Sequence, residues 1–286
     1  MSVYREFDLE ELEVQYDIEA SVDSLETYQL RYQGMSEKVV QEIGGQLDVS
    51  YGPDPLQCMD IFPASEAGSP ICVFIHGGYW IRGDKGGTRF PAATFNEAGA
   101  TWITINYRLA RDMNLDEIIS DVRQAISYIY MNAAEMNGGG ERIFIAGSSA
   151  GGHLTGMLAA PGWQADHDLP DDVIKGATAI SGLHDLEPFL YASQKSYLKL
   201  DADAVRRNSP IHNLPREGIP LGVVWGGKET DEFQRQSKAY AEACADAGIR
   251  LKTLFMAEQD HFSMNGELAN PQSPLTRAIL GVMDLG

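Results

Sequence analysis

A short apolar run in the middle of the chain leads directly into a serine flanked by glycines. Residues 143–146 (Ile-Phe-Ile-Ala) precede the segment Gly-Ser-Ser-Ala-Gly at residues 147–151, and a helix-like stretch begins at Gly152. This order predicts a buried strand, a sharp turn and a helix. In that setting G-x-S-x-G is typical of a nucleophile elbow, in which a strained turn lifts the central serine above the carboxyl edge of a sheet. We therefore expect Ser149 at such an edge.

The rest of the chain has the same character, because apolar runs alternate with stretches of helical periodicity. The other predicted strands are residues 70–75, 101–106, 173–180, 221–225 and 249–255. The predicted helices are residues 87–98, 115–134, 154–160, 233–247 and 275–283. Continuous apolar runs are expected for strands covered on both faces, so we predict an α/β fold in which helices flank a mostly parallel central sheet. Sites in such sheets lie outside the carboxyl ends of the strands.

Two segments stand apart from this alternation. Residues 1–40 form an acidic N-terminal region, and residues 185–213 form an insertion rich in aromatic residues. We expect residues 1–286 to form a single domain in which these two segments make a small cap. The first part of the N-terminal region suits either a frayed tail or an extension that folds over the body, and residues 24–40 are more helix-like. The expected anchors of such an extension are Tyr4, Phe7, Leu12 and Tyr16.

Two further patterns carry local predictions. Residues 47–51 and 56–62 read as strands joined by the tight turn Gly-Pro-Asp-Pro, which predicts a hairpin. Glycines 138–140 stand between a predicted helix and a predicted strand. A phosphate-binding loop has the opposite order, so we interpret this glycine run as a helix stop.

Composition excludes several classes of function. The chain has 41 acidic and 22 basic residues, a formal charge of −19, so its average field repels phosphate backbones and anionic membranes. We expect neither a nucleic acid nor a membrane as a partner. The acidic N-terminus lacks the features of a signal peptide, and Cys58, Cys72 and Cys244 are too widely spaced for a disulfide framework. These features predict a cytoplasmic protein with reduced core cysteines.

A serine hydroxyl becomes a useful nucleophile only with a base in reach and a group that orients that base. In hydrolases with this strand–helix alternation, the chain order is serine, acid, histidine. His261 follows the last predicted strand and is the only histidine beyond residue 212. It is therefore the expected base for Ser149. His153 lies one helical turn after Ser149 and is expected to support the elbow.

Three carboxylates follow the predicted strand at residues 221–225, where the acid is expected. Glu229 is favoured because it lies nearest the strand end. Asp231 and Glu232 suit the first turn of the next helix, although Asp231 stays an alternative. Asp260 is less favoured, because a carboxylate adjacent to His261 in the chain rarely has the geometry to orient it.

The segment after the first buried strand predicts an oxyanion site. His-Gly-Gly-Tyr-Trp occupies residues 76–80, and glycines there let the backbone approach a substrate closely. We expect the backbone N–H groups of Gly77, Gly78 and Ala150 to stabilise a tetrahedral oxyanion. No H-x-x-x-H or C-x-x-C spacing is present, so no metal and no cofactor is expected. Candidate pocket residues, which also suit an ordinary core, are Tyr79, Trp80, His184, Phe189 and Tyr191.

Taken together, these motifs resemble the α/β-hydrolase superfamily, and within it the H-G-G-x-W branch that includes the kynurenine formamidases (arylformamidases) and related esterases. The resemblance implies an α/β-hydrolase fold with Ser149 as nucleophile, His261 as base and Glu229 as acid, where the formamidases usually have aspartate. Residues 1–40 match the family poorly. The similar segments are Tyr51-Gly52, residues 60–63, residues 76–80, residues 83–85, residues 106–109, the elbow, Ser181-Gly182, Asp185-Leu186, Glu232-Phe233, Gln236-Ser237 and residues 260–262.

These observations predict a cofactor-free serine hydrolase that cleaves a small N-acyl or N-formyl amide through an acyl-enzyme. A carboxylesterase for short-chain acyl esters is the alternative. A catalytically dead binding protein on the same fold is the rival from another class, and the presence of all three triad members argues against it. The expected partner is thus a small-molecule ester or amide, and the sequence leaves homodimer formation open.

Overall fold

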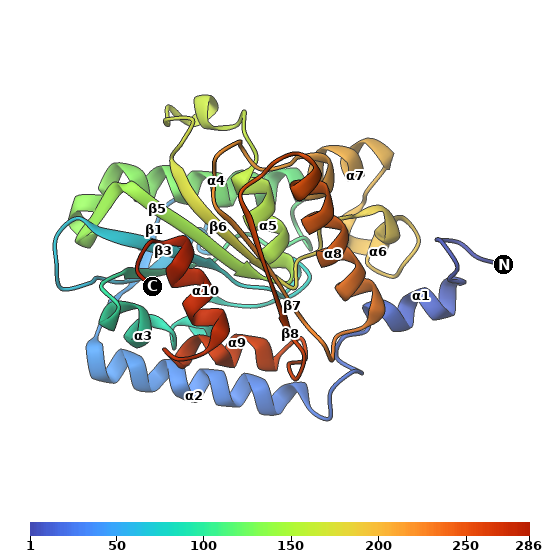
Figure 1. The fold of residues 1–286 in the computed structure, drawn as a ribbon, viewed down its shortest axis with the longest axis horizontal. Coiled ribbons are helices and arrows are strands. Elements are labelled where there is room, and N and C mark those ends of the chain that lie inside the picture. The colour runs from blue at the N-terminus through green and yellow to red at the C-terminus, as the bar shows by residue number, and fades with distance from the viewer.

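The computed structural model describes residues 1–286 and contains one eight-stranded sheet between two layers of helices (Figure 1). The strand order is β1-β2-β4-β3-β5-β6-β7-β8. Strands β3 to β8 are mutually parallel, whereas β2 pairs antiparallel with both β1 and β4. The strands are β1 (Gln46–Ser50), β2 (Cys58–Phe62), β3 (Ser69–Ile75), β4 (Thr101–Ile105), β5 (Gly138–Ser148), β6 (Ile174–Ile180), β7 (Leu221–Gly226) and β8 (Leu251–Met256).

Both faces of the sheet are buried, as the continuous apolar runs predict. In β3, Ile71 and Val73 pack in the cluster that contains α4, α5 and α8, while Cys72 and Phe74 pack in the cluster that contains α3 and α10. The helices are α1 (Leu9–Tyr16), α2 (Leu25–Ile43), α3 (Ala92–Glu97), α4 (Leu115–Asn132), α5 (Ala150–Ala159), α6 (Lys195–Leu198), α7 (Ala202–Asn208), α8 (Asp231–Asp246), α9 (Ser263–Gly266) and α10 (Pro274–Val282). None combines the length and apolar character that crossing a bilayer needs.

The predicted strands and the opening hairpin are confirmed, with boundaries that differ by a few residues. The interpretation of glycines 138–140 as a helix stop is wrong, because they begin β5. The chain instead leaves the preceding 3₁₀ turn at Asn137, which adopts φ 55°. A side chain at Gly138 would collide with Ile71 of the neighbouring β3, so glycine lets the two strands approach there. The predicted helix over residues 87–98 is also shorter, since it is α3 preceded by a 3₁₀ turn over Lys85–Thr88.

The N-terminal region folds over the body, which decides between the two alternatives left by its sequence. Asp8 and Glu11 form a reciprocal capping box that starts α1. Leu12 and Tyr16 of this helix are buried, and α1 packs against α8. Tertiary packing thus stabilises a helix whose sequence is a poor autonomous helix former. Figure 1 shows α2 running along the same side of the sheet as α3 and α10.

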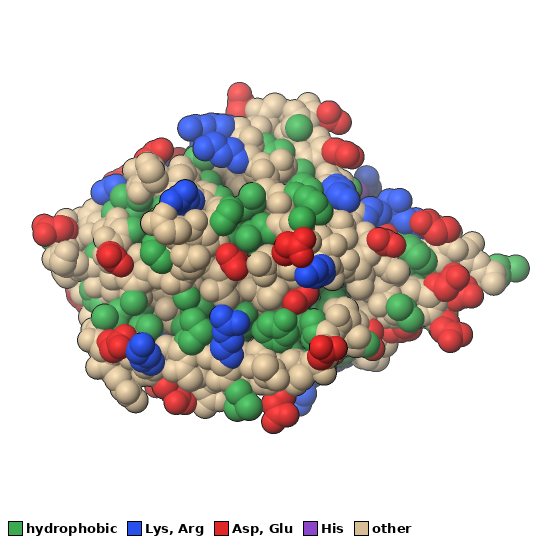
Figure 2. All heavy atoms as spheres, turned by 60° about the horizontal axis from the view of Figure 1, so that its bottom comes forward, with side chains coloured by type: hydrophobic (Ala, Val, Ile, Leu, Met, Phe, Trp, Pro, Cys, Tyr) green, Lys and Arg blue, Asp and Glu red, His purple; other side chains and the backbone are tan.

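The acidic residues do not gather into one patch on the face that Figure 2 shows. Asp and Glu side chains are dispersed there, with Lys and Arg between them and apolar atoms among both. This distribution fits a well-solvated surface carrying a formal charge of −19. The three cysteines are free and buried, in agreement with the expectation of reduced core residues.

Candidate active site

Ser149 occupies a sharp turn between β5 and α5. Its backbone lies in the left-handed region, with φ 60° and ψ −120°, which is a strained conformation for a residue with a side chain. Side chains at positions 147 and 151 would collide with the backbone, at the carbonyls of Gly151 and Ile75 respectively. The two glycines are therefore a steric requirement of the turn, and Ser149 stands at the carboxyl end of the central strand.

Hydrogen bonds to β6 and within the surrounding core stabilise the turn at Ser149. The Ser149 N–H donates to the Ile180 carbonyl at 2.9 Å. His153, on the first turn of α5, accepts from Trp80 Nε1 at 3.2 Å and places Nε2 2.7 Å from the Asn208 carbonyl. Burial lowers the pKa of His153 to about 4, so the ring is neutral and serves as a structural link. Its position agrees with the expectation that it supports the elbow.

The structure brings Glu229 and His261 together in the interior. His261 Nδ1 lies 2.6 Å from Glu229 Oε1, and the other carboxylate oxygen accepts the Gly226 N–H at 2.7 Å. Both side chains are buried, and Phe233 packs edge-on against the imidazole at a centroid distance of 4.6 Å. A carboxylate at Nδ1 fixes the ring tautomer and leaves Nε2 as the proton acceptor.

The other carboxylates considered from the sequence lie elsewhere. Asp231 is exposed in the first turn of α8, as expected for an acidic residue at a helix N-terminus. The Asp260 carboxylate accepts the backbone N–H groups of Phe262 and Ser263 and does not orient the imidazole. Of the candidate acids, Glu229 alone forms a hydrogen bond with His261.

The loop after β3 lies against Ser149 with free backbone donors. A side chain on Gly77 would stand 3.0 Å from the Ser149 Cβ, so the loop backbone runs directly beside the serine. The N–H groups of Gly77 and Gly78 donate to no acceptor in the protein. Ala150 begins α5, where an N–H has no intrahelical acceptor. These three groups are therefore available to bind an oxyanion next to Ser149.

The same loop has an unusual backbone conformation, and its first residue, His76, packs it against the protein core. Gly78, Tyr79 and Trp80 all have positive φ, at 113°, 52° and 60°. His76 stacks on Tyr107 at a centroid distance of 4.4 Å, and the Tyr107 hydroxyl donates to the His76 carbonyl at 2.9 Å. Burial lowers the pKa of His76, so its ring is neutral and acts as a packing residue.

A cleft of about 530 Å³ opens over Ser149 and His261. The loop after β3 and the 3₁₀ turn form one wall, and α2 forms the opposite wall. Most of the lining residues are polar or glycine, but apolar atoms make up the larger part of the exposed lining surface, and Tyr32, Tyr79 and Phe262 are its aromatic members. The remaining lining residues include Leu25, Gln29, Gln33, Ser36, Glu37, Arg82, Asp84, Thr88, Arg89 and Asn265.

Comparison with known proteins agrees with this geometry. The BD-FAE family model matches residues 59–187. A solved structure from Silicibacter sp. tm1040 superimposes with a TM-score of 0.82 and 29% identity, covering 94% of this chain and 98% of that one. Esterase B from Lactobacillus rhamnosis superimposes with a TM-score of 0.68 and 17% identity over 94% of this chain and 97% of its own. The chain has the α/β-hydrolase fold.

Among curated proteins, this α/β-hydrolase resembles formamidases and esterases. The kynurenine formamidase of Danio rerio is 27% identical over 98% of both chains. The esterase LipQ of Mycobacterium tuberculosis is 28% identical over 70% of this chain and 53% of its own length. The resemblance to formamidases therefore extends through the N-terminal region, whereas the resemblance to LipQ leaves part of each protein unmatched.

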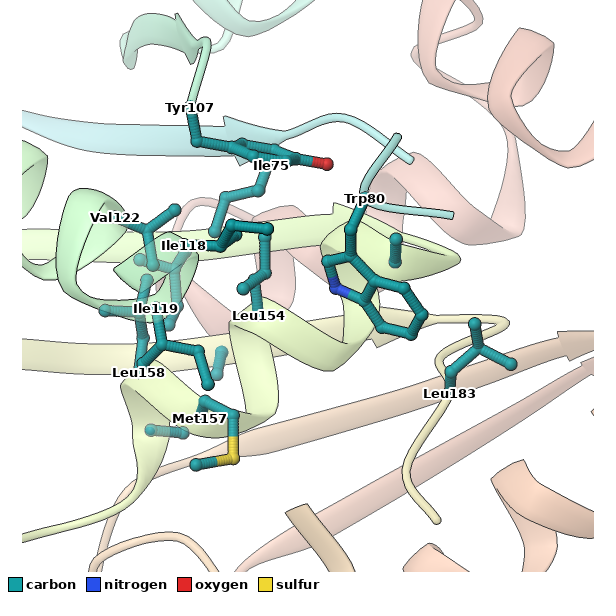
Figure 3. Packing of buried hydrophobic residues seen from close by; sticks show 14 of the residues in the cluster. Ile75, Trp80, Tyr107, Ile118, Ile119, Val122, Leu154, Met157, Leu158 and Leu183 are labelled. Atoms are coloured by element: carbon teal, nitrogen blue, oxygen red, sulfur yellow. The ribbon is translucent and has the colours of Figure 1, made fainter. Parts of the chain in front are cut away.

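Four of the five predicted pocket residues in the hydrolase do not line the cleft; only Tyr79 does. Trp80 is fully buried and points into the core beside Leu154 and Leu183 (Figure 3). The backbone twist that begins at Gly78 turns the Trp80 indole toward α5, where its Nε1 donates to His153, and the ring does not line the cleft. The prediction for Trp80 is therefore wrong.

His184, Phe189 and Tyr191 also lie outside the cleft. His184 is buried against Tyr240, with ring centroids 4.0 Å apart, and both of its nitrogens lack a partner. Phe189 is fully buried behind Tyr79 and Tyr16. Tyr191 is exposed and lies near Tyr4. The insertion thus packs its aromatic residues against the N-terminal region instead of against the site.

Sequence reasoning missed the polar wall of the hydrolase cleft. Gln29, Gln33 and Ser36 reach it from α2, and their helical spacing is the signal that places them on one face. Arg89 reaches it from the segment after the 3₁₀ turn, where its Nε bonds Asp60 at 2.6 Å. No group of three or more His, Cys, Asp or Glu side chains is arranged to hold a metal ion.

Proposed function

We propose that this hydrolase cleaves a small N-acyl or N-formyl amide through a covalent acyl-enzyme on Ser149. The observation that carries the proposal is the buried 2.6 Å contact between His261 Nδ1 and Glu229 Oε1, made by a histidine that shares the cleft with Ser149. Gly77, Gly78 and Ala150 supply the oxyanion donors. This assigns the triad Ser149–His261–Glu229 to acyl transfer.

The proposed reaction has two halves. His261 Nδ1–H donates to Glu229, so Nε2 accepts the Ser149 proton as Oγ attacks the acyl carbonyl carbon. The carbonyl electrons move onto oxygen, and the free N–H groups beside Ser149 bind the resulting oxyanion. Collapse breaks the C–N bond, and His261 gives its proton to the departing amine. Water then attacks the acyl-enzyme with His261 again as base, releasing the carboxylic acid and restoring Ser149.

Two observations favour an amide with a polar body over a lipophilic ester. The formamidase of Danio rerio matches the whole chain, including the segment that forms α2. The cleft wall built by α2 carries Gln29, Gln33 and Ser36, which can form hydrogen bonds with a polar substrate. A small compound with hydrogen-bonding groups can use this wall, whereas a plain hydrocarbon chain cannot.

A carboxylesterase for short-chain acyl esters is the second candidate, and a specific observation supports it. The esterase LipQ of Mycobacterium tuberculosis aligns with 70% of this chain. Serine hydrolases form the same acyl-enzyme from esters and amides, and an ester is the easier substrate because an alkoxide is a much better leaving group than an amide anion, so that C–N cleavage requires protonation of the nitrogen. The two candidates therefore differ in the leaving group and not in the residues.

A parallel turnover screen separates the candidates. N-formylkynurenine, small N-acyl amides and p-nitrophenyl acetate are assayed with the wild type and with Ser149→Ala. We expect turnover of the formyl or acyl amide, abolished in the variant. Turnover of the ester without any amide would reject the amide proposal, and no turnover of any substrate would favour the binding-protein rival.

We also propose a domain organisation for the chain. Residues 1–286 contribute to one continuous sheet with its helices, which supports a single domain. Residues 1–40 contribute a wall of the cleft, and residues 185–213 pack against them away from the cleft, so we assign the two segments together as its cap. A cytoplasmic location and homodimer formation stay predictions, the first of them supported by the three free, buried cysteines.

A further inference from the structure

The N-terminal arm, defined as residues 4–43, forms hydrogen bonds with each of three loops around the site. The oxyanion loop is residues 76–80, the acid loop residues 226–230 and the base loop residues 260–262. In the oxyanion loop, the Tyr79 hydroxyl donates to the Tyr16 carbonyl at 2.7 Å, and both residues are buried. Tyr79 directly follows Gly78, so this bond ties the arm to the backbone that presents the oxyanion donors.

The acid loop is tied to the residue before Tyr16. Thr230 directly follows Glu229, and its hydroxyl donates to the Gln15 carbonyl at 2.7 Å. The Gln15 side chain in turn accepts the Glu232 N–H at 3.1 Å. Thr230 is the N-cap of α8, but its side chain accepts no bond from that helix. The hydroxyl that usually caps a helix is therefore used here to hold the arm.

The base loop is tied to α2 on both sides of the histidine. The Tyr28 hydroxyl donates to Asp260 Oδ2 at 2.8 Å, and the Tyr32 hydroxyl donates to the Phe262 carbonyl at 2.7 Å. Asp260 and Phe262 are the chain neighbours of His261. Because Tyr28 and Tyr32 are four residues apart, they project from one face of the helix.

A row of packed aromatic rings runs through the arm from the oxyanion loop to the base. Tyr79 packs edge-on against Phe189 at 6.3 Å, and Phe189 packs against Tyr16 at 4.8 Å. Tyr16 is 5.9 Å from Phe233, and Phe233 is 4.6 Å from His261. Tyr16 stands in the middle of this row. The row also accounts for the buried position of Phe189, which lies behind the cleft wall.

The Tyr16 side chain is itself anchored on α8. Its hydroxyl donates to Glu232 Oε2 at 2.8 Å and accepts from Gln236 Nε2 at 2.9 Å. Burial raises the pKa of Tyr16 well above its usual value, so the hydroxyl stays protonated and remains a donor. Gln236 also binds the carbonyl of Asp185 at 3.0 Å. Residues 232 and 236, which the sequence places in a family-like segment, thus form the docking site for the arm.

We propose that the N-terminal arm is a positioning element of the active site, with Tyr16 of the arm and Thr230 of the acid loop as the central positioning residues. The arm fixes the oxyanion donors, the acid and the base relative to one another by bonding to all three loops. The inference rests on the proposed function, because it assigns those loops to acyl transfer. Catalytic groups displaced by a fraction of an ångström lose rate without a matching loss of substrate binding.

The test removes single hydroxyls that link the arm to the loops. Thr230→Val and Tyr79→Phe each delete one bond with little change in shape. We expect each to lower kcat about tenfold while KM changes less than about twofold, since one such bond is equivalent to about a tenfold factor. Thr230→Ser keeps the hydroxyl and is expected to restore kcat to near the wild-type value.

Tyr51→Phe is the matched control. The Tyr51 hydroxyl is buried and donates to the Asn106 carbonyl at 2.7 Å, the same length and type of bond, but its acceptor lies outside the three loops. We expect Tyr51→Phe to leave kcat unchanged. Equal losses of kcat in Tyr51→Phe and Tyr79→Phe would overturn the proposal, because they would show a general cost of losing a buried hydroxyl.

Amide hydrogen exchange measured by mass spectrometry supplies a readout that does not depend on turnover. Faster exchange is expected in peptides covering residues 226–230 of Thr230→Val and residues 78–82 of Tyr79→Phe, where the Ile81 and Arg82 N–H groups donate to the Gly78 carbonyl, with the rest of each protein unchanged. Wild-type exchange and wild-type kcat in both variants would overturn the positioning role. Failure of the wild type to react with a fluorophosphonate at Ser149 would instead overturn the proposed function, while the exchange data still decide whether the arm holds the loops.

Discussion

His261 and His184 are both buried histidines that follow strand ends, and their surroundings differ in a way that explains the different roles we propose for them. His261 follows β8, has Glu229 at Nδ1 and faces the cleft that contains Ser149. His184 follows β6, stacks on Tyr240 and has no partner at either nitrogen. Burial is common to both. A carboxylate partner and an opening onto the nucleophile are what make a histidine a base, and only His261 has them.

The largest difference is expected in turnover. His261→Ala removes the proposed base and should lower kcat/KM by about 10⁶-fold, as loss of the histidine of a serine–histidine–acid triad does. His184→Leu is the matched change at the other histidine, and its kcat/KM should stay within about twofold of the wild type. Steady-state kinetics on the preferred substrate measures both. A comparable loss in His184→Leu would end the distinction between the two residues.

A smaller effect is expected when the carboxylate partner is neutralised. Glu229→Gln keeps the shape but removes the charge that stabilises the imidazolium, and kcat should fall by about 10²- to 10⁴-fold. Asp231→Asn, two residues away and exposed, is the control and should behave like the wild type. Near-wild-type kcat in Glu229→Gln together with a large loss in Asp231→Asn would move the acid to Asp231.

The smallest effect is expected in the pH dependence of the free energy of unfolding, and it concerns His184, which has no hydrogen-bond partner. Burial lowers the pKa of His184 to about 3, so between pH 6.5 and 3 the unfolded chain binds a proton at this position that the folded protein does not. The free energy of unfolding therefore falls as pH falls, with about 2 kcal/mol of the loss between pH 7 and pH 5 due to His184. His184→Leu should lose correspondingly less stability over that interval.

Urea unfolding at pH 7 and pH 5 measures this contribution. His153 is also buried, with its pKa lowered to about 4, so the variant keeps part of the pH dependence. An identical change in the free energy of unfolding for wild type and His184→Leu would show that His184 is protonated or hydrated in the folded protein.

Much of the fold and the centre of the site follow from local sequence patterns. The apolar runs predict the parallel strands, because a strand covered on both faces needs such residues throughout. Ser149, Glu229 and His261 each lie just after a predicted strand, and the carboxyl ends of parallel strands meet at one edge. The structure accordingly brings Glu229 and His261 into contact and places Ser149 and His261 around one cleft.

The surroundings of the site could not be predicted in the same way. Trp80 faces the core because of three successive residues with positive φ, a path that its residue types do not reveal. Tyr16 meets Glu232, a residue 216 positions further along the chain, and no periodicity encodes a contact of that range. Helix α1 could not be predicted either, because its sequence has a weak helical pattern and the helix depends on packing against α8.

The central claim is that Ser149 is a nucleophile activated by His261, and covalent labelling tests it most directly. The folded wild type, His261→Ala and His184→Leu are treated with a fluorophosphonate, and the modified peptide is identified by mass spectrometry. We predict rapid, stoichiometric labelling of Ser149 in the wild type and in His184→Leu, and labelling at least about 100-fold slower in His261→Ala. Absence of label on Ser149 in the folded wild type would contradict the account.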